Sequence, residues 1–239
     1  WLDIDEQQAI EYFYDSNLRC YNISNDDLRF IIMLAKKTQL VNKRSAVDFA
    51  HGILLFSLIK NYPTSHVKVA EIGTAKGFSA LCMSAAITSG GKTGLVLTTD
   101  IIPNWVERYW NDVGDLEGKI SRHNFIVEEF KALRANIMFL SMASFNISNT
   151  VDFPEIDVWF FDGVHSPKAI RTEYTFAKKS ASSNTVYIFD DCTDDYKDYR
   201  TEVESLLIED GMIYNLISSK WGRKKFYIAS KNGVHNEIL

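Results

Sequence analysis

Three carboxylates and one imidazole lie directly after two apolar runs in the second half of the chain. Asp162 and His165 follow the run IDVWFF, and Asp190 and Asp191 follow the run NTVYIF. Such short apolar runs are typical of buried strands, and carboxylates gathered at strand ends repel one another unless a cation neutralises them. An all-oxygen set of ligands favours a hard divalent ion, Mg²⁺ before Ca²⁺. The pattern therefore predicts a metal site made by Asp162, Asp190 and Asp191.

His165 is the histidine whose position suggests chemistry, because it stands three residues after Asp162. A neutral imidazole can take up a proton near neutral pH, so His165 is a candidate general base. Lys168 is a weaker candidate, because a solvated lysine stays protonated. The ordinary alternatives are a capping or core role for His165 and a helix N-cap for Asp190 and Asp191.

A second polar cluster lies in the run VAEIGTAKGFSA, where Glu71 ends an apolar stretch and Gly73 and Gly77 follow. Glycine allows a tight turn and the close approach of a ligand, and a helix N-terminus offers free N–H groups to an anion. Dinucleotide-binding turns have the spacing G-x-G-x-x-G, so the spacing found here disfavours a nicotinamide-dependent oxidoreductase. The ordinary alternative is a strand–turn–helix with two structural glycines.

Regular elements must hold these residues in place, and the apolar runs predict where they lie. From residue 67 onward, short apolar runs alternate with longer amphipathic segments, one of them around residues 104–110. This alternation is typical of a parallel sheet with helices on both faces. Strands are expected at residues 67–73, 94–100, 136–141, 156–162 and 184–190, with a terminal hairpin at 213–219 and 224–230. Helices are expected at residues 78–87, 166–181 and 198–210.

The first sixty residues have a helical pattern. Capping-box spacings at residues 24–27 and 45–48 each precede a segment with apolar residues on one face. Residues 5–15 have a weaker helical pattern. The expected organisation is a helical N-terminal extension or lid at residues 1–62 and one α/β domain at residues 63–239.

The sequence of the glycine turn, E-x-G-T-x-x-G-F-S-A, resembles motif I of class I methyltransferases, which bind S-adenosylmethionine (SAM). It looks especially like the motif of the catechol-type O-methyltransferases. The resemblance implies the Rossmann-like methyltransferase fold, an α/β doubly wound, mostly parallel seven-stranded sheet that ends in an antiparallel hairpin. It also implies that Glu71 and the backbone of residues 73–77 hold the methionine part of SAM and that Ser79 holds its carboxylate. Thr74 and Phe78 belong to the same implied site.

Two further positions fit this resemblance. Asp100 ends the second expected strand, where an acid can accept hydrogen bonds from both ribose hydroxyls. Ser144, in the segment SMASF, matches the residue that contacts adenine in the catechol-type family, although Met142 replaces the family's glycine. The ordinary alternative for Asp100 is a solvated turn acid.

The segments D-G-x-H-S and D-D resemble those of metal-dependent O-methyltransferases that modify macrolide sugars, the macrocin and mycinamicin type. The resemblance implies that Asp162, Asp190 and Asp191 hold the metal and that His165 is the base. Catechol-type enzymes carry a lysine at the position of His165. The implied reaction is a metal-dependent methyl transfer from SAM to a hydroxyl oxygen, with a vicinal hydroxyl of a sugar or glycosylated product as the acceptor. A catechol-type enzyme acting on small molecules and a non-catalytic SAM-binding assembly domain of a larger polypeptide are the alternatives.

Composition excludes several other classes. A formal net charge of −5 argues against a nucleic-acid partner, and three widely spaced cysteines indicate neither a disulfide framework nor a zinc site. No apolar run is long enough to predict a membrane span. The expected location is the cytoplasm. The chain begins with Trp, which suggests a piece of a longer polypeptide, and homo-oligomerisation is left open.

Overall fold

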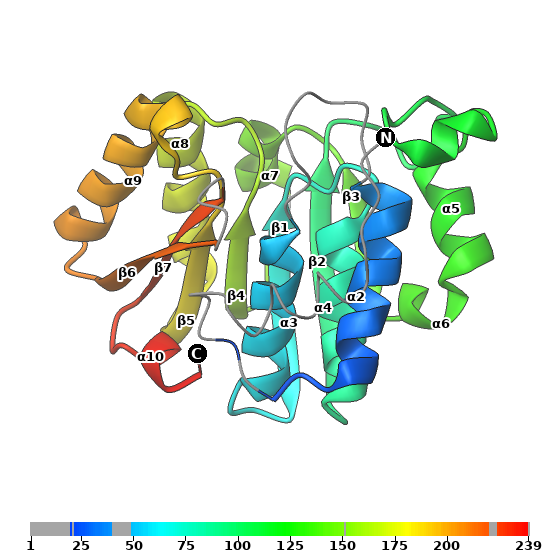
Figure 1. Ribbon diagram of the computed structural model, residues 1–239. Coiled ribbons are helices and arrows are strands. Elements are labelled where there is room, and N and C mark those ends of the chain that lie inside the picture. Colours follow the sequence, from blue (N-terminus) through cyan, green and yellow to red (C-terminus); the bar gives the residue numbers. More distant parts are fainter. Residues whose placement is uncertain (1–19, 21, 40–48, 151, 220–223, 239) are drawn as a thin grey trace.

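The computed structural model describes residues 20, 22–39, 49–150, 152–219 and 224–238 (Figure 1). In these residues seven strands form one sheet in the order β3-β2-β1-β4-β5-β7-β6. Strands β1 to β5 run parallel to one another, whereas β7 runs antiparallel to both β5 and β6. The predicted doubly wound sheet with an antiparallel terminal hairpin is confirmed.

The strands match the predicted apolar runs to within a few residues. They are β1 His66–Ile72, β2 Thr93–Asp100, β3 Ile137–Ser141, β4 Ile156–Phe161, β5 Ala181–Phe189, β6 Ile213–Ser218 and β7 Lys225–Ser230. The central strands are continuously apolar because helices cover both faces of the sheet. In β4, for example, Phe160 packs in the hydrophobic core on one face and Trp159 in the core on the other.

Helices cover the sheet in two layers (Figure 1). The first layer shares one hydrophobic core and consists of α2 Asn25–Thr38, α3 Ala50–Asn61, α4 Phe78–Ser89, α5 Arg122–Glu129 and α6 Lys131–Arg134, with α10 His235–Ile238 at its edge. The second layer packs on the other core and consists of α7 Ser144–Thr150, α8 Pro167–Ala177 and α9 Lys197–Glu209. None of the described helices has both the length and the apolar character that a membrane crossing requires.

The N-terminal helices α2 and α3 pack in the same core as α4. Ser24 and Asp27 form the predicted capping box at the start of α2. The described part of α3 begins at Ala50, so the start predicted at residues 45–48 lies outside the described residues, as does the helix predicted at residues 5–15. Because α2 and α3 bury apolar faces against the sheet layer, they belong to its core; a lid role for the extension stays a prediction.

The segment between β2 and α5 differs from the amphipathic pattern of the sequence. It contains only a short 3₁₀ turn, η1 Val113–Leu116, and an isolated bridge between Arg108 and Ile120. The Asp115 carboxylate accepts backbone N–H bonds from Trp110 and Asn111 at 2.8 and 2.6 Å, which favours a turn over a helix. A core position is the ordinary expectation for a tryptophan, but Trp105 in this segment is 71% exposed. Trp221 lies outside the described residues.

Four helices, α5, α6, α7 and α10, have no counterpart in the sequence prediction. All are short, with eight, four, seven and four residues, so none is long enough to show a repeating apolar stripe. Helix α7 begins at Ser144, the residue matched to the adenine contact.

Candidate active site

The glycine turn after β1 lies against the segment that follows β4. Gly73 has a φ of +101°, and a Cβ atom there would lie 1.9 Å from the backbone oxygen of Asp162. The Asp162 amide donates to the Ile72 carbonyl at 2.8 Å, which fixes the two segments together. Only glycine is compatible with this conformation and this contact. The turn and the first acid of the predicted metal site are therefore direct neighbours.

Gly77 ends the turn and begins α4. Its φ is +108°, its amide donates to the Thr74 carbonyl at 2.9 Å, and no side chain caps the helix. Phe78, the next residue, is buried, and its ring lies 4.8 Å from that of His51 on α3. Because no side chain caps α4, the backbone N–H groups at its N-terminus are available to an anionic ligand group.

Glu71 is fully buried at the end of β1. Its carboxylate accepts hydrogen bonds from the hydroxyls of Ser79 and Thr98, and the hydroxyls of Thr74 and Thr98 lie 2.5 Å apart. Burial raises the pKa of Glu71 to about 7, against the opposing effect of the Ser79 and Thr98 hydrogen bonds. The structure thus gathers three of the predicted cofactor residues in one network and adds Thr98, which the sequence did not single out.

Asp100 is held by the protein rather than left in solvent. Its carboxylate accepts from the amides of Ala75 and Ile102 at 2.7 and 2.8 Å and forms a 3.0 Å ion pair with Arg122. The Arg122 side chain is almost fully buried, and its Nε also donates to the Ala75 carbonyl at 2.5 Å. This excludes the alternative of a solvated turn acid. Arg122 had no signal in the sequence, because nothing there indicates that the start of α5 reaches the glycine turn.

Ser144, at the start of α7, is paired with a buried acid on α8. Burial raises the pKa of Glu173 to about 7, against the opposing effect of a hydrogen bond with Ser144. Glu173 Oε1 has no hydrogen-bond partner in the described part of the chain, and this carboxyl lies near Gly163. Glu173 lies in a predicted amphipathic helix, in which acidic residues are ordinarily solvated. The sequence therefore carried no signal that this acid is buried.

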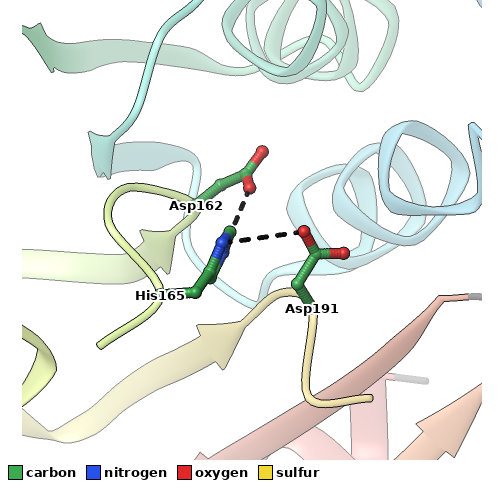
Figure 2. Close-up of side chains that lie close together, drawn as sticks. All are labelled: Asp162, His165 and Asp191. Atoms are coloured by element: carbon green, nitrogen blue, oxygen red, sulfur yellow. Dashed lines mark ion pairs between the residues drawn. The ribbon is translucent and has the colours of Figure 1, made fainter. Parts of the chain in front are cut away.

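An acid–imidazole–acid cluster lies at the ends of β4 and β5. His165 Nε2 lies 3.7 Å from Asp162 Oδ1, and His165 Nδ1 lies 3.8 Å from Asp191 Oδ2. Figure 2 shows the imidazole between the two carboxylates. Asp191 has a φ of +52°, a left-handed conformation that is rare outside glycine.

Asp190, predicted as the third metal ligand, points elsewhere. It is fully buried, and its two oxygens accept from the Asp191 amide at 2.6 Å and from Lys224 Nζ at 2.7 Å. Lys224 Nζ also lies 2.8 Å from Asp191 Oδ1. Among the described residues, the group that converges is Asp162, His165 and Asp191. Lys224 lies just before β7, more than thirty residues from these acids, so its part in the site had no local sequence signal.

The donor atoms of Asp162, His165 and Asp191 all lie within 4.8 Å of one another. A divalent ion binds ligand atoms at roughly 2.0–2.6 Å, so ligands on opposite sides of it are about 4–5 Å apart. Two carboxylates and an imidazole with this spacing fit such an ion.

Burial and mutual repulsion set the charges in the cluster. Burial, followed by the charge of Asp190, raises the pKa of Asp162 well above its usual range. Burial lowers the pKa of His165, although Asp191 and Asp190 act in the opposite direction, so the imidazole is neutral near pH 7. Burial alone would lower the pKa of Lys224, but Asp190, Asp162 and Asp191 raise it well above its ordinary value. The cluster is thus a place where added positive charge is favourable.

Residues 70–192 match the sequence profile of a protein family described as "Methyltransferase domain". The match covers more than half of the chain. The chain belongs to this methyltransferase family. The matched residues include both the glycine turn and the acid cluster of the methyltransferase, and the predicted enzyme class is confirmed. A comparison with curated protein sequences finds no match.

Solved structures of similar fold span nearly the whole methyltransferase. The cofactor-bound protein Rv0187 from MTB has a TM-score of 0.62 and 16% identity, over 96% of this chain and 98% of its own. The O-methyltransferase TomG from Streptomyces achromogenes, involved in tomaymycin synthesis and solved with SAM, has a TM-score of 0.58 and 18% identity, over 95% and 99%. An O-methyltransferase from Bacillus cereus, solved with SAH, has a TM-score of 0.58 and 14% identity, over 95% and 99%. At these identities the likeness establishes the fold alone.

Proposed function

We propose that this methyltransferase transfers a methyl group from SAM to a hydroxyl oxygen and that the reaction depends on a divalent cation. The observation that carries the proposal is the position of His165. Its imidazole, with a lowered pKa, lies between two carboxylates, and the backbone of one of them, Asp162, contacts the glycine turn at Gly73. His165 Nε2 is buried and has no hydrogen-bond partner in the described residues, so it is free to accept a proton.

The glycine turn supports the use of SAM. A backbone cradle without side chains at Gly73 and Gly77 leaves room for the methionine part, and the N-terminus of α4 can receive its carboxylate. Asp100 and Ser144 lie at the ends of β2 and β3, where the ribose and the adenine would lie by the resemblance. Two of the similar structures hold SAM or SAH, which agrees with this assignment.

Asp162 and Asp191 would hold the divalent cation, and Asp190 supports Asp191 through its backbone amide. When bound, the cation supplies a Lewis acid beside the acceptor hydroxyl, and SAM supplies an electrophilic methyl group. His165 would take the proton of the acceptor hydroxyl, and the methyl group would pass from the sulfonium sulfur of SAM to the acceptor oxygen, with SAH as the leaving group.

The proposed acceptor is a vicinal hydroxyl of a sugar or glycosylated product, as the resemblance to the macrolide-sugar enzymes implies. The ring of Tyr196, which is partly exposed, lies 4.9 Å from that of His165 and offers an apolar wall for the acceptor. An aromatic wall can also stack on a catechol ring, so a catechol-type acceptor is the second candidate.

Isothermal titration calorimetry tests the proposal with SAM and Mg²⁺ as separate ligands. Asp191→Ala is expected to bind SAM like the wild type and to lose Mg²⁺ affinity by at least about tenfold, because a cation ligand is removed. Asp194→Ala is the control, since the Asp194 side chain is 80% exposed and pairs with Arg200. Absence of SAM binding in all three proteins would contradict the SAM assignment, and equal Mg²⁺ affinity in all three would contradict the metal site.

A further inference from the structure

Lys224 brings a positive charge into the acid cluster from the other end of the chain. Its ammonium lies 2.7 Å from Asp190 Oδ2 and 2.8 Å from Asp191 Oδ1, and its side chain is 18% exposed. Its backbone is fixed by Ser219, whose amide donates to the Lys224 carbonyl at 2.8 Å and whose hydroxyl accepts from the Lys224 amide at 3.3 Å. The terminal hairpin therefore positions this ammonium.

Asp190 depends more strongly than Asp191 on Lys224 as a counter-charge. Asp190 is fully buried, and an ionised carboxylate without a counter-charge is strongly unfavourable there. Asp191 is 22% exposed, and its second oxygen faces His165 and Asp162, where a divalent ion fits. One carboxylate thus lies between two cation positions, a fixed ammonium on one side and the proposed metal site on the other.

A divalent ion and an ammonium that share Asp191 would repel each other strongly, because both positive charges would lie within a few ångströms of the same carboxylate. We infer that Lys224 is an internal counter-cation that competes with the divalent ion for Asp191. When the metal binds, the ammonium leaves Asp191 and keeps Asp190 as its partner. The inference rests on the proposed metal site, and it makes Lys224 a residue that sets the metal affinity.

Metal titration of the full chain tests this competition. Calorimetry with Mn²⁺ and with Mg²⁺ is expected to give Lys224→Met an affinity about tenfold or more above that of the wild type, because no ammonium opposes the ion. Lys225→Met is the matched control, since the adjacent lysine pairs instead with the exposed Asp194 at 3.3 Å, and it is expected to bind as the wild type does. Equal or weaker metal binding by Lys224→Met would overturn the inference.

A second measurement applies if the buried Asp190 prevents Lys224→Met from folding. Lys224→Arg keeps the charge and is expected to fold and to bind metal no more tightly than the wild type. Thermal unfolding is then followed with and without Mg²⁺. A gain in thermal stability on addition of Mg²⁺ that is larger for Lys224→Met than for Lys224→Arg supports the competition, because an ion that binds the folded state more tightly stabilises it more. An equal or smaller gain for Lys224→Met would overturn it.

The same preparations separate this inference from the proposed function. Wild-type metal binding that is lost in Asp191→Ala but not strengthened in Lys224→Met would refute the competition alone. No metal binding by either the wild type or Lys224→Met would refute the metal site itself. SAM titration of each variant reports independently on the cofactor half of the site.

Discussion

His165 is positioned by contacts on several sides. The ring of Tyr199 lies edge-on to the imidazole, with the ring centroids 5.1 Å apart. The carboxylate oxygens of Asp162 and Asp191 lie 3.7 and 3.8 Å from the imidazole nitrogens, which is too far for a short hydrogen bond. A neutral imidazole in this position can serve as base or as metal ligand, and these roles differ in what a substitution removes.

His165→Asn is expected to reduce methyl transfer by about 10²–10⁴-fold, because the group that receives the proton is lost. The measurement is SAH formation with a vicinal-diol probe such as catechol, alongside calorimetry of SAM and Mg²⁺. Unchanged Mg²⁺ affinity in the variant supports the base role. A parallel loss of Mg²⁺ affinity would contradict it and make the imidazole a ligand. His123→Asn is the control, because the His123 ring contacts the exposed Trp105, with the ring centroids 3.6 Å apart.

Residue types and spacing predicted which acids gather at the strand ends, but not how each carboxylate is oriented. Asp190 and Asp191 are adjacent in the chain, yet the left-handed backbone at Asp191 directs one carboxylate inward and the other toward His165. Partners distant along the chain, such as Lys224 and Arg122, depend on how strands and helices pack, and no local pattern encodes that.

At the scale of elements, the β1–α4 turn is the most constrained part of the site. Gly73 combines a positive φ with direct contact to the backbone after β4, whereas Gly91 has a φ of +62° and no atom within 4 Å of an added Cβ. Both glycines have a positive φ that would strain a side chain introduced there, but only Gly73 is crowded, so the two positions separate the effect of backbone conformation from that of crowding.

Gly73→Ala is expected to lower the free energy of unfolding by about 3 kcal/mol or more, since strain and a backbone clash add together. Gly91→Ala is expected to cost only about 1–2 kcal/mol, the cost of the left-handed conformation alone. Urea denaturation of both variants provides the comparison. Equal losses would show that the contact with the Asp162 backbone oxygen is not a real constraint.

Strands and long helices were predictable because their apolar periodicity is set by burial on both faces of the sheet. The segment around residues 104–110 was not, because its apolar residues are exposed and a side chain, Asp115, satisfies the backbone amides of its turn. Helix α7 is too short to carry a periodic signal.

At the scale of the whole molecule, His51 connects the N-terminal helices to the catalytic edge. It lies on α3, its ring stacks parallel to Phe160 of β4 at 6.3 Å, and its Nδ1 is buried without a hydrogen-bond partner in the described residues. Burial, followed by the charge of Lys224, lowers the pKa of His51 to about 3, while Asp191 acts in the opposite direction.

A lowered histidine pKa makes stability depend on pH in a definite direction. The neutral imidazole is favoured in the folded state, so its contribution is complete above the unfolded value of about 6.5 and is lost as the pH falls below it. Between pH 6.5 and 5 the wild type is expected to lose about 2 kcal/mol from this group. The free energy of unfolding of His51→Leu is expected to fall by about 2 kcal/mol less than that of the wild type over the same pH range. Urea denaturation at each pH measures the difference. Parallel curves for the two proteins would contradict the assignment, and pH 8 serves as the reference.

The reversed direction of β7 has a consequence for how such sites diversify. A parallel strand brings its last residue to the edge of the sheet where Asp162 and Asp191 lie, but an antiparallel strand brings its first, and Lys224 directly precedes the first residue of β7. Exchanging the β6–β7 hairpin between related enzymes would add or remove the positive charge at the position of Lys224. The glycine turn, which is proposed to bind SAM, would stay unchanged. If Lys224 sets the metal affinity as inferred above, that affinity can be inherited separately from recognition of the methyl donor.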